Sequence, residues 1–409
     1  MNNRVNEHRI TINQILVIVL AALAIFTPLF RYQKMVILVV LFTMWFISAI
    51  VVDTGFMRSC AGTVVLLIGI LVLDLLRGVF CSDTSYIVQG INKMPTFMWI
   101  IILQFYSRNT IKAKRMVFPV LVMFAISSFF TIKGNVLYPG ASRMLANALE
   151  YYANIRNQYI NLNIGGYGYA YACVFMILPL LVYLSTKNKQ LVKIIFLPCI
   201  LIFTVTISGY FIGLILSIAY VVVFLVKPKN MHRYIISILV FLIIVLLCRD
   251  LILELLIRVG NALNQEAIVK HASELMTGSY FQDETTYSRL TLFKNALQNW
   301  LDNPVFGSLF TNNITRGAGH SALLEYLQNY GVFSFVYFSL YKKVYKTVLN
   351  KIQTQKIKNW WILYFFVLIM FLLFDIIDSF CALGFVVFFF GPILMIMADE
   401  EYSLTTINT

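Results

Sequence analysis

The residues best able to carry chemistry lie in polar segments that interrupt an otherwise apolar chain. Arg289 stands in the run Tyr287-Ser288-Arg289-Leu290, and Arg316 and His320 come shortly before an apolar stretch that begins at Ser321. A guanidinium stays charged and binds two phosphate oxygens at once, while a histidine can take a proton from a hydroxyl. Together these residue types suit a phosphate-bearing donor and a hydroxyl acceptor.

An earlier polar segment adds further candidates for substrate binding, Arg143 and Arg156, among many tyrosines and asparagines. Glu325 is a third, because on a helix it shares a stripe with Ser321, beside the stripe of His320. For Arg156 and Arg316, contact with lipid headgroups is an equally good interpretation.

Carboxylates near the apolar runs are further candidates for metal or substrate binding. Asp375 and Asp378 lie one helical turn apart and are candidates for substrate binding; the alternative is a solvated helix end or an internal partner for an arginine. Asp74 and Arg77 lie three residues apart inside an apolar run, where mutual neutralisation is the simpler interpretation, although charges at that depth are often functional. No HExxH motif occurs, so the sequence predicts neither a metal nor a cofactor.

The elements that position these residues are predicted to be membrane-spanning helices. Hydrophobic residues make up 60% of the 409 positions and charged residues 12%, more apolar surface than a soluble domain can bury. The sequence therefore predicts an all-α, polytopic membrane protein of about twelve transmembrane helices, with residues 1–409 forming a single membrane domain. The predicted spans are Ile12–Phe30, Met35–Val52, Ala61–Phe80, Met94–Tyr106, Met116–Ile132, Ile164–Ser185, Leu191–Ile207, Tyr210–Val226, Tyr234–Leu247, Ser321–Tyr341, Trp360–Phe374 and Phe380–Met397.

The basic residues predict the orientation. Lysines and arginines cluster in the connections near residues 108–115, 187–193, 227–233 and 342–358, which twelve helices place on one side together with both termini. The positive-inside rule makes that side the cytoplasm. The same rule accounts for the net charge of +14, so nucleic acid is not an expected partner.

Two outward segments, residues 133–163 and 249–319, are too long to be simple turns, and function is expected there. The second forms a large extracytoplasmic loop with a helix-like apolar stripe, Leu290, Phe293, Leu297 and Trp300. This stripe predicts a short amphipathic helix that ends near Asp302 and lies on the outer membrane surface or packs on the bundle.

Several motifs resemble the signature region of the bacterial polysaccharide polymerase and O-antigen ligase superfamily, which includes the Wzy-type polymerases of capsule and O-antigen assembly. In order, they are Ser288-Arg289-Leu290, Asn303-Pro304-Val305-Phe306-Gly307 and Gly319-His320-Ser321 with a later Tyr330-Gly331. The pattern is an arginine, an NPxxG turn, and a histidine opening a helix that ends in Tyr-Gly. Arg143 followed by Gly165-Gly166-Tyr167-Gly168-Tyr169 is similar to the polymerase branch, which adds Tyr169 to the substrate-binding candidates.

The resemblance implies a GT-C-like glycosyltransferase of the bacterial cytoplasmic membrane. The donor would be a growing glycan on undecaprenyl pyrophosphate, and the acceptor the non-reducing sugar of a new lipid-linked repeat unit. It implies a metal-independent, inverting transfer on the outer face, with Arg289 and Arg143 on the pyrophosphate and His320 on the acceptor hydroxyl. Membrane lipid, a flippase and a chain-length regulator are the other partners it implies.

The chain departs from the family pattern at one turn. Many members of that superfamily carry a Ser-Arg-Gly-like turn where this chain reads Ser208-Gly209-Tyr210. If an arginine there matters in those proteins, Arg143 or Arg316 would have to take its role here. Two alternatives to a polymerase remain open: a ligase that passes finished glycan to another acceptor, and a flippase or transporter of lipid-linked oligosaccharide. Transporters more often show paired halves, which this sequence lacks.

Overall fold

The computed structural model describes most of the chain, and every regular element in the described part is a helix. The described residues are 11–30, 35–146, 153–186, 191–225, 247–277, 284–311, 321–374 and 381–407. The helices of the first half are α1 (Ile12–Ile25), α2 (Thr27–Phe30), α3 (Met35–Val52), α4 (Phe56–Phe80), α5 (Thr84–Tyr106), α6 (Thr110–Leu137), α7 (Ala141–Met144), α8 (Ala153–Asn161), α9 (Tyr167–Thr186), α10 (Leu191–Ile207) and α11 (Phe211–Leu225). Those of the second half are α13 (Arg249–Ala262), α14 (Glu266–Thr277), α15 (Glu284–Asp302), α16 (Ala322–Tyr330), the 3₁₀ turn η4 (Gly331–Ser334), α17 (Phe335–Leu349), α18 (Gln355–Phe374), α19 (Cys381–Phe385), the π-helical turn η5 (Val386–Phe390) and α20 (Gly391–Ile407).

Six of the described helices are long and apolar enough to cross a membrane. They are Met35–Val52, Phe56–Phe80, Thr110–Leu137, Tyr167–Thr186, Gln355–Leu373 and Cys381–Ser403. Three shorter apolar helices are Ile12–Ile25, Phe196–Ile207 and Phe211–Leu225. The predicted class, a helical membrane protein, is confirmed; the predicted count of about twelve spans stays a prediction, and the predicted span Tyr234–Leu247 falls, except for Leu247, outside the described residues.

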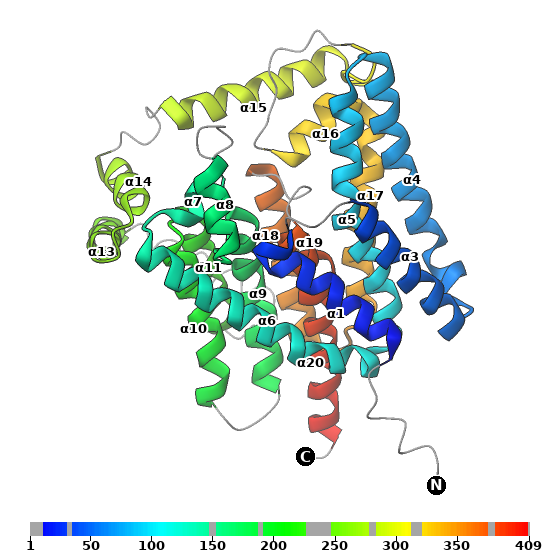
Figure 1. The fold of residues 1–409 in the computed structure, drawn as a ribbon, viewed down its shortest axis with the longest axis horizontal. Helices are drawn as coiled ribbons and strands as arrows, with labels where there is room; N and C mark the ends of the chain where they lie inside the picture. Colours follow the sequence, from blue (N-terminus) through cyan, green and yellow to red (C-terminus); the bar gives the residue numbers. More distant parts are fainter. Residues whose placement is uncertain are drawn as a thin grey trace.

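The peripheral and central helices differ in what their apolar residues contact. On α3, large side chains such as Val36, Val40 and Val51 are exposed, which only lipid can cover favourably. On α9, by contrast, every residue from Tyr169 to Tyr183 is buried, because α10, α11, α19 and α20 surround it. The helix α9 is therefore the centre of the bundle (Figure 1).

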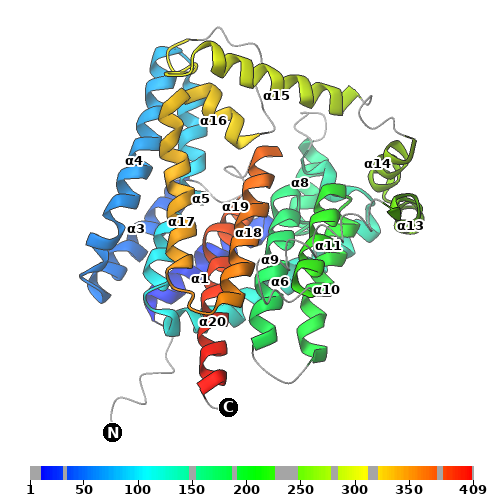
Figure 2. The same cartoon turned by 180° about the vertical axis from the view of Figure 1, so that it is seen from behind.

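The polar segments gather at one end of the bundle. In Figure 1, α15 lies across the top of the molecule, with α13 and α14 beside it, whereas α20 runs down to the opposite end. The same arrangement is seen from behind in Figure 2, and in Figure 1 α7 and α8 also lie toward the end that carries α15. Parts of the two long segments predicted to face outward are thus found at the same end.

The predicted single span Ser321–Tyr341 is wrong. The helix α16 ends at Tyr330, and α17 begins only after the 3₁₀ turn η4. The break is at Gly331, whose φ of +52° and ψ of −131° no α-helix contains. As a result α16 is a short helix at the upper end that continues into α17 through a sharp bend (Figure 2).

The predicted short helix Met94–Tyr106 is also longer than expected. The helix α5 begins ten positions earlier, at Thr84, because the Asp83 side chain caps it by accepting a hydrogen bond from the Ser85 backbone N–H at 2.8 Å. Its first half carries polar residues such as Lys93, which hid it from a search for apolar runs. This half packs against α4 and brings Lys93 to the buried charges of that helix.

Candidate functional site

The structure locates some of the predicted site residues and not others. His320, Arg316, Asp375 and Asp378 lie outside the described residues. The backbone of Arg289 is part of α15, but its side chain is not among those described. The geometry of the site therefore rests on Arg143, Arg156, Tyr169 and Glu325 and on the elements that carry the others.

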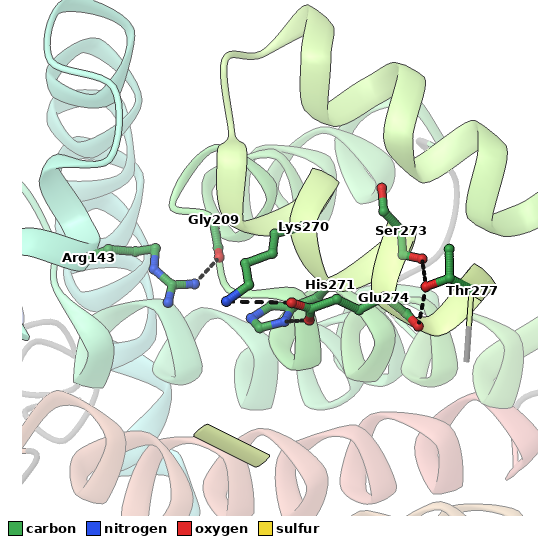
Figure 3. Close-up of polar contacts among 7 residues, drawn as sticks. All are labelled: Arg143, Gly209, Lys270, His271, Ser273, Glu274 and Thr277. Atoms are coloured by element: carbon green, nitrogen blue, oxygen red, sulfur yellow. Dashed lines mark hydrogen bonds and ion pairs between the residues drawn. The ribbon is translucent and has the colours of Figure 1, made fainter. Parts of the chain in front are cut away.

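Arg143 contacts the Ser208-Gly209-Tyr210 turn. The residue lies on the short helix α7, and its Nη1 donates a hydrogen bond to the Gly209 carbonyl at 3.0 Å (Figure 3). Its guanidinium carbon lies 6.0 Å from the centre of the Tyr210 ring. An arginine from elsewhere in the chain is thus placed on the Ser208-Gly209-Tyr210 turn. That Arg143 takes a functional role there stays a prediction.

The fold holds both sides of this contact in place. Gly209 has a φ of +73°, and a Cβ there would come 2.7 Å from the Gln265 side-chain oxygen, so the turn needs glycine. The Tyr210 hydroxyl donates to the Ser142 carbonyl at 3.0 Å, and the Ser142 hydroxyl donates to the Gly165 carbonyl at 2.6 Å. Arg143 is therefore presented by a short helix that is tied to its neighbours on both sides.

Two other predicted residues differ in their surroundings. Tyr169 is buried in the core, where its hydroxyl donates to the Phe124 carbonyl at 2.9 Å and lies 2.8 Å from the Ser128 hydroxyl. This side chain therefore joins α9 to α6, and the idea that Tyr169 binds substrate stays a prediction. Arg156 is half-buried on α8, which lies toward the same end of the molecule as α7 (Figure 1).

A polar cluster on α14 lies close to the Arg143 turn and was not predicted. Glu274 is 3.2 Å from His271 Nδ1 through one oxygen and 3.4 Å from Lys270 Nζ through the other (Figure 3). The helix packs on α11 through the buried Ile268 and Ala272. The three-residue and four-residue spacings of the cluster, on an amphipathic segment, are the signal that would have revealed it.

Glu325 lies on α16 near a second, buried cluster. There Asp74 on α4 accepts hydrogen bonds from the hydroxyls of Tyr330 and, at 3.4 Å, Tyr337, and it lies 3.9 Å from Lys93 Nζ. Asp74 is thus paired with Lys93, so the interpretation that Asp74 and Arg77 neutralise each other is wrong. The helix α5, which begins earlier than predicted, supplies the lysine that replaces Arg77 as the ion partner.

Burial raises the pKa of Glu325, although the charges of Lys93 and Arg77 lower it in part. The residue belongs to α16, which is not one of the helices long and apolar enough to span the membrane. Ser321 caps the start of this helix by accepting a hydrogen bond from the Leu324 backbone N–H at 3.3 Å. The residue that follows His320 in the chain is therefore fixed in place.

The NPxxG turn and the Tyr-Gly end of α16 form one hydrogen-bonded unit, which we call the glycine lock. Ser308 N donates to the Gln328 carbonyl at 2.8 Å, and Val332 N donates to the Pro304 carbonyl at 3.0 Å. Gly307 and Gly331 both have positive φ, and a Cβ at either would come within 2.5 Å of a carbonyl of the other segment. Only glycine allows the two segments to approach this closely.

The glycine lock fixes the geometry of the elements above it. It joins the end of α15, the helix of Arg289, to the end of α16, the helix that begins after His320. The first turn of α16 lies beside the upper end of α18, whose last described residue precedes Asp375 (Figure 2). The helices that carry or adjoin most of the predicted site residues thus converge beneath α15.

Within the described residues, no group of three or more His, Cys, Asp or Glu side chains stands close enough to hold a metal ion. The polar groups that the described site offers to a substrate are the Arg143 guanidinium, the His271–Glu274 pair and the Glu325 carboxyl.

Comparison of the chain with protein-family models, with curated proteins and with solved structures found no match.

Proposed function

We propose that this protein is a repeat-unit polymerase of a bacterial surface polysaccharide. It would transfer the growing glycan from undecaprenyl pyrophosphate to the non-reducing end of a new lipid-linked repeat unit. The reaction would take place at the end of the bundle that carries α15, on the outer face of the cytoplasmic membrane. The proposal rests on the residue pattern and on the geometry around α15 and α16.

The glycine lock is the observation that carries this proposal. Two motifs that resemble the polymerase signature, separated in sequence by more than twenty residues, meet through reciprocal backbone contacts. This contact sets the helix of Arg289 across the helix that follows His320. Helices joined in this way would support the fixed placing of Arg289 and His320 that a transfer from a phosphate-bearing donor requires.

The chemistry follows from the residue types. The acceptor hydroxyl would attack the anomeric carbon of the donor, form the new glycosidic bond and break the bond to undecaprenyl pyrophosphate, with inversion. His320 would take the hydroxyl proton. Arg289 and Arg143 would stabilise the negative charge that grows on the leaving pyrophosphate. Arg143 suits this role because its bond to Gly209 uses one N–H and leaves others for phosphate oxygens.

Complementation of a deletion strain tests the proposal. The strain receives the wild type, His320→Ala, Arg289→Lys or the control Arg258→Lys, a position in the same long segment whose side chain is 74% exposed. We expect long polymer from the wild type and the control. The two site variants should leave single lipid-linked repeats and reach the membrane in normal amount. Normal polymer from both site variants would refute the assignment.

The same strain separates the alternatives. Accumulated single repeats in the deletion strain support a polymerase, whereas accumulated polymer that is not attached to an acceptor indicates a ligase. If the protein is a flippase, its deletion would leave the repeats on the inner face of the membrane, where an externally added glycosidase does not reach them. Each pattern is read from the lipid-linked glycans extracted before and after glycosidase treatment of intact cells.

A further inference from the structure

Arg77 is a buried cation whose side chain has no hydrogen-bonding partner in the described part of the chain. The residue lies in the last turn of α4 and is 3% exposed, and its Nε is a buried donor without an acceptor. Buried charges are normally paired, because removing a charged group from water without giving it an acceptor is costly. The described residues thus leave the Nε donor of Arg77 without an acceptor, and a bound ligand is one group that could supply it.

The carboxylates around Arg77 do not supply that acceptor. Asp74 forms an ion pair with Lys93 and accepts hydrogen bonds from the hydroxyls of Tyr330 and Tyr337. Glu325 and Asp83 are near enough for their pKa values to respond to Arg77, but neither forms an ion pair with it within 4.0 Å in the described residues. The carbonyl ends of α4 favour a cation at this position, yet that interaction is weak and leaves the donors unbonded.

The guanidinium is oriented by aromatic rings. Its carbon lies 4.0 Å from the centre of the Tyr86 ring and 6.0 Å from that of Tyr330. Stacking of this kind uses the face of the guanidinium, whereas its N–H groups point outward in the plane. A guanidinium held by its face keeps its in-plane N–H groups for hydrogen bonds, and these match the oxygens of a phosphate group.

The position fits a substrate of the proposed reaction. Arg77 lies in the last turn of α4, just before the exposed connection to α5. This connection lies at the end of the bundle that carries α15 (Figure 2). Arg77 contacts Tyr330 at the end of α16, whereas Arg143 belongs to α7, which lies on another part of the bundle (Figure 1). A polymerase of the proposed kind handles two lipid pyrophosphates, one on the donor and one on the acceptor.

We infer that Arg77 binds the pyrophosphate of the acceptor lipid, while Arg143 serves the donor. This inference rests on the proposed function, because only a reaction between two lipid-linked glycans needs a second pyrophosphate site. The Tyr86 ring positions the guanidinium, and Lys93 adds positive charge nearby.

Calorimetric titration with inorganic pyrophosphate tests the inference. The full chain is placed in nanodiscs of phosphatidylcholine, and the wild type is compared with Arg77→Gln, Arg77→Lys and the control Arg258→Lys. We expect two sites in the wild type and in the control. Each Arg77 variant should weaken one site by about tenfold or more, the effect of losing a charge-assisted fork. Arg77→Lys keeps the buried charge and so guards against a folding defect.

The outcomes that would overturn the inference are distinct from failure of the proposed function. A single pyrophosphate site in the wild type, or unchanged binding by both Arg77 variants, overturns it. Loss of the Arg77-dependent site when the nanodiscs contain phosphatidylglycerol would assign the site to bulk lipid headgroups and also overturn it. The proposed function fails separately, if His320→Ala and Arg289→Lys make normal polymer while the pyrophosphate titration is as expected.

Discussion

Arg143 illustrates how much depends on a single hydrogen bond in this molecule. Its Nη1 holds the Gly209 carbonyl at 3.0 Å, which leaves the rest of the fork for a ligand. Lysine keeps the charge but lacks the second arm, so it cannot hold the turn and offer paired donors at once. We expect Arg143→Lys to reduce long polymer by about tenfold, measured in the deletion strain, with Arg258→Lys unchanged. Full polymer from Arg143→Lys would exclude a role for the fork.

Glu325 gives a prediction on the pH dependence of stability. Burial raises its pKa in the folded state above the ordinary 4.5, so the folded protein holds this proton to higher pH than the unfolded chain does. The charged form therefore destabilises the fold above the folded pKa, and this penalty disappears as the pH falls to 4.5. In Glu325→Gln the side-chain amide does not titrate, so this pH-dependent penalty is absent.

The detergent-solubilised variant Glu325→Gln should melt above the wild type at neutral pH, by a few degrees at most, and with no advantage near pH 4.5. Glu254→Gln, at an exposed glutamate paired with Arg258, serves as the control. A constant difference across the pH range would mean that the carboxyl of Glu325 is not desolvated as inferred.

At the scale of elements, the glycine lock predicts a strong contrast between two glycines with positive φ. A Cβ at Gly331 would come 2.5 Å from the Val305 carbonyl oxygen, whereas one at Gly140 meets nothing within 4 Å. Gly331→Ala should destabilise the protein by about 3 kcal/mol or more, and Gly140→Ala by about 1–2 kcal/mol. Thermal melts of both variants in detergent measure the difference. Equal effects would mean that the lock is not a rigid contact.

The sequence was most informative where local patterns decide the structure. The apolar stripe of residues 290–300 predicted a helix ending near Asp302, and α15 ends there. The break at Gly331 was missed because it depends on the Pro304 and Val305 carbonyls, which are distant in sequence. Lys93 was missed because a search for apolar runs passes over the polar half of a helix.

The candidate site shows the same limit. The resemblance left Arg143 and Arg316 as the two arginines that could act at the Ser208-Gly209-Tyr210 turn, and the packing of α7 brings Arg143 to it. Tyr169 belongs to a recognisable motif, yet its place on α9 turns it into the core. Residue type and spacing therefore indicate chemistry, while tertiary contacts decide which of the candidates face one another.

For the whole molecule, the position of α15 predicts an orientation that labelling can test. In a variant whose native cysteines are replaced by alanine, two positions can be labelled separately: Thr84→Cys at the start of α5 and Asn350→Cys directly after the end of α17. The start of α5 lies toward the end that carries α15, and the end of α17 points the opposite way (Figure 2). A membrane-impermeant maleimide added to intact cells should label residue 84 readily and residue 350 only after permeabilisation, because the basic connection near residue 350 is expected in the cytoplasm. The reverse pattern would invert the proposed topology.

The contact between Arg143 and Gly209 also has a genetic consequence. Its acceptor is a main-chain oxygen, which every amino acid at codon 209 would still provide, whereas most changes at codon 143 delete the donor. Alleles that lose only this contact should therefore collect at codon 143, and alleles at codon 209 should instead behave as folding defects, because the turn has a φ of +73°. The two ends of one hydrogen bond would then fall into separate phenotypic classes in a mutant screen.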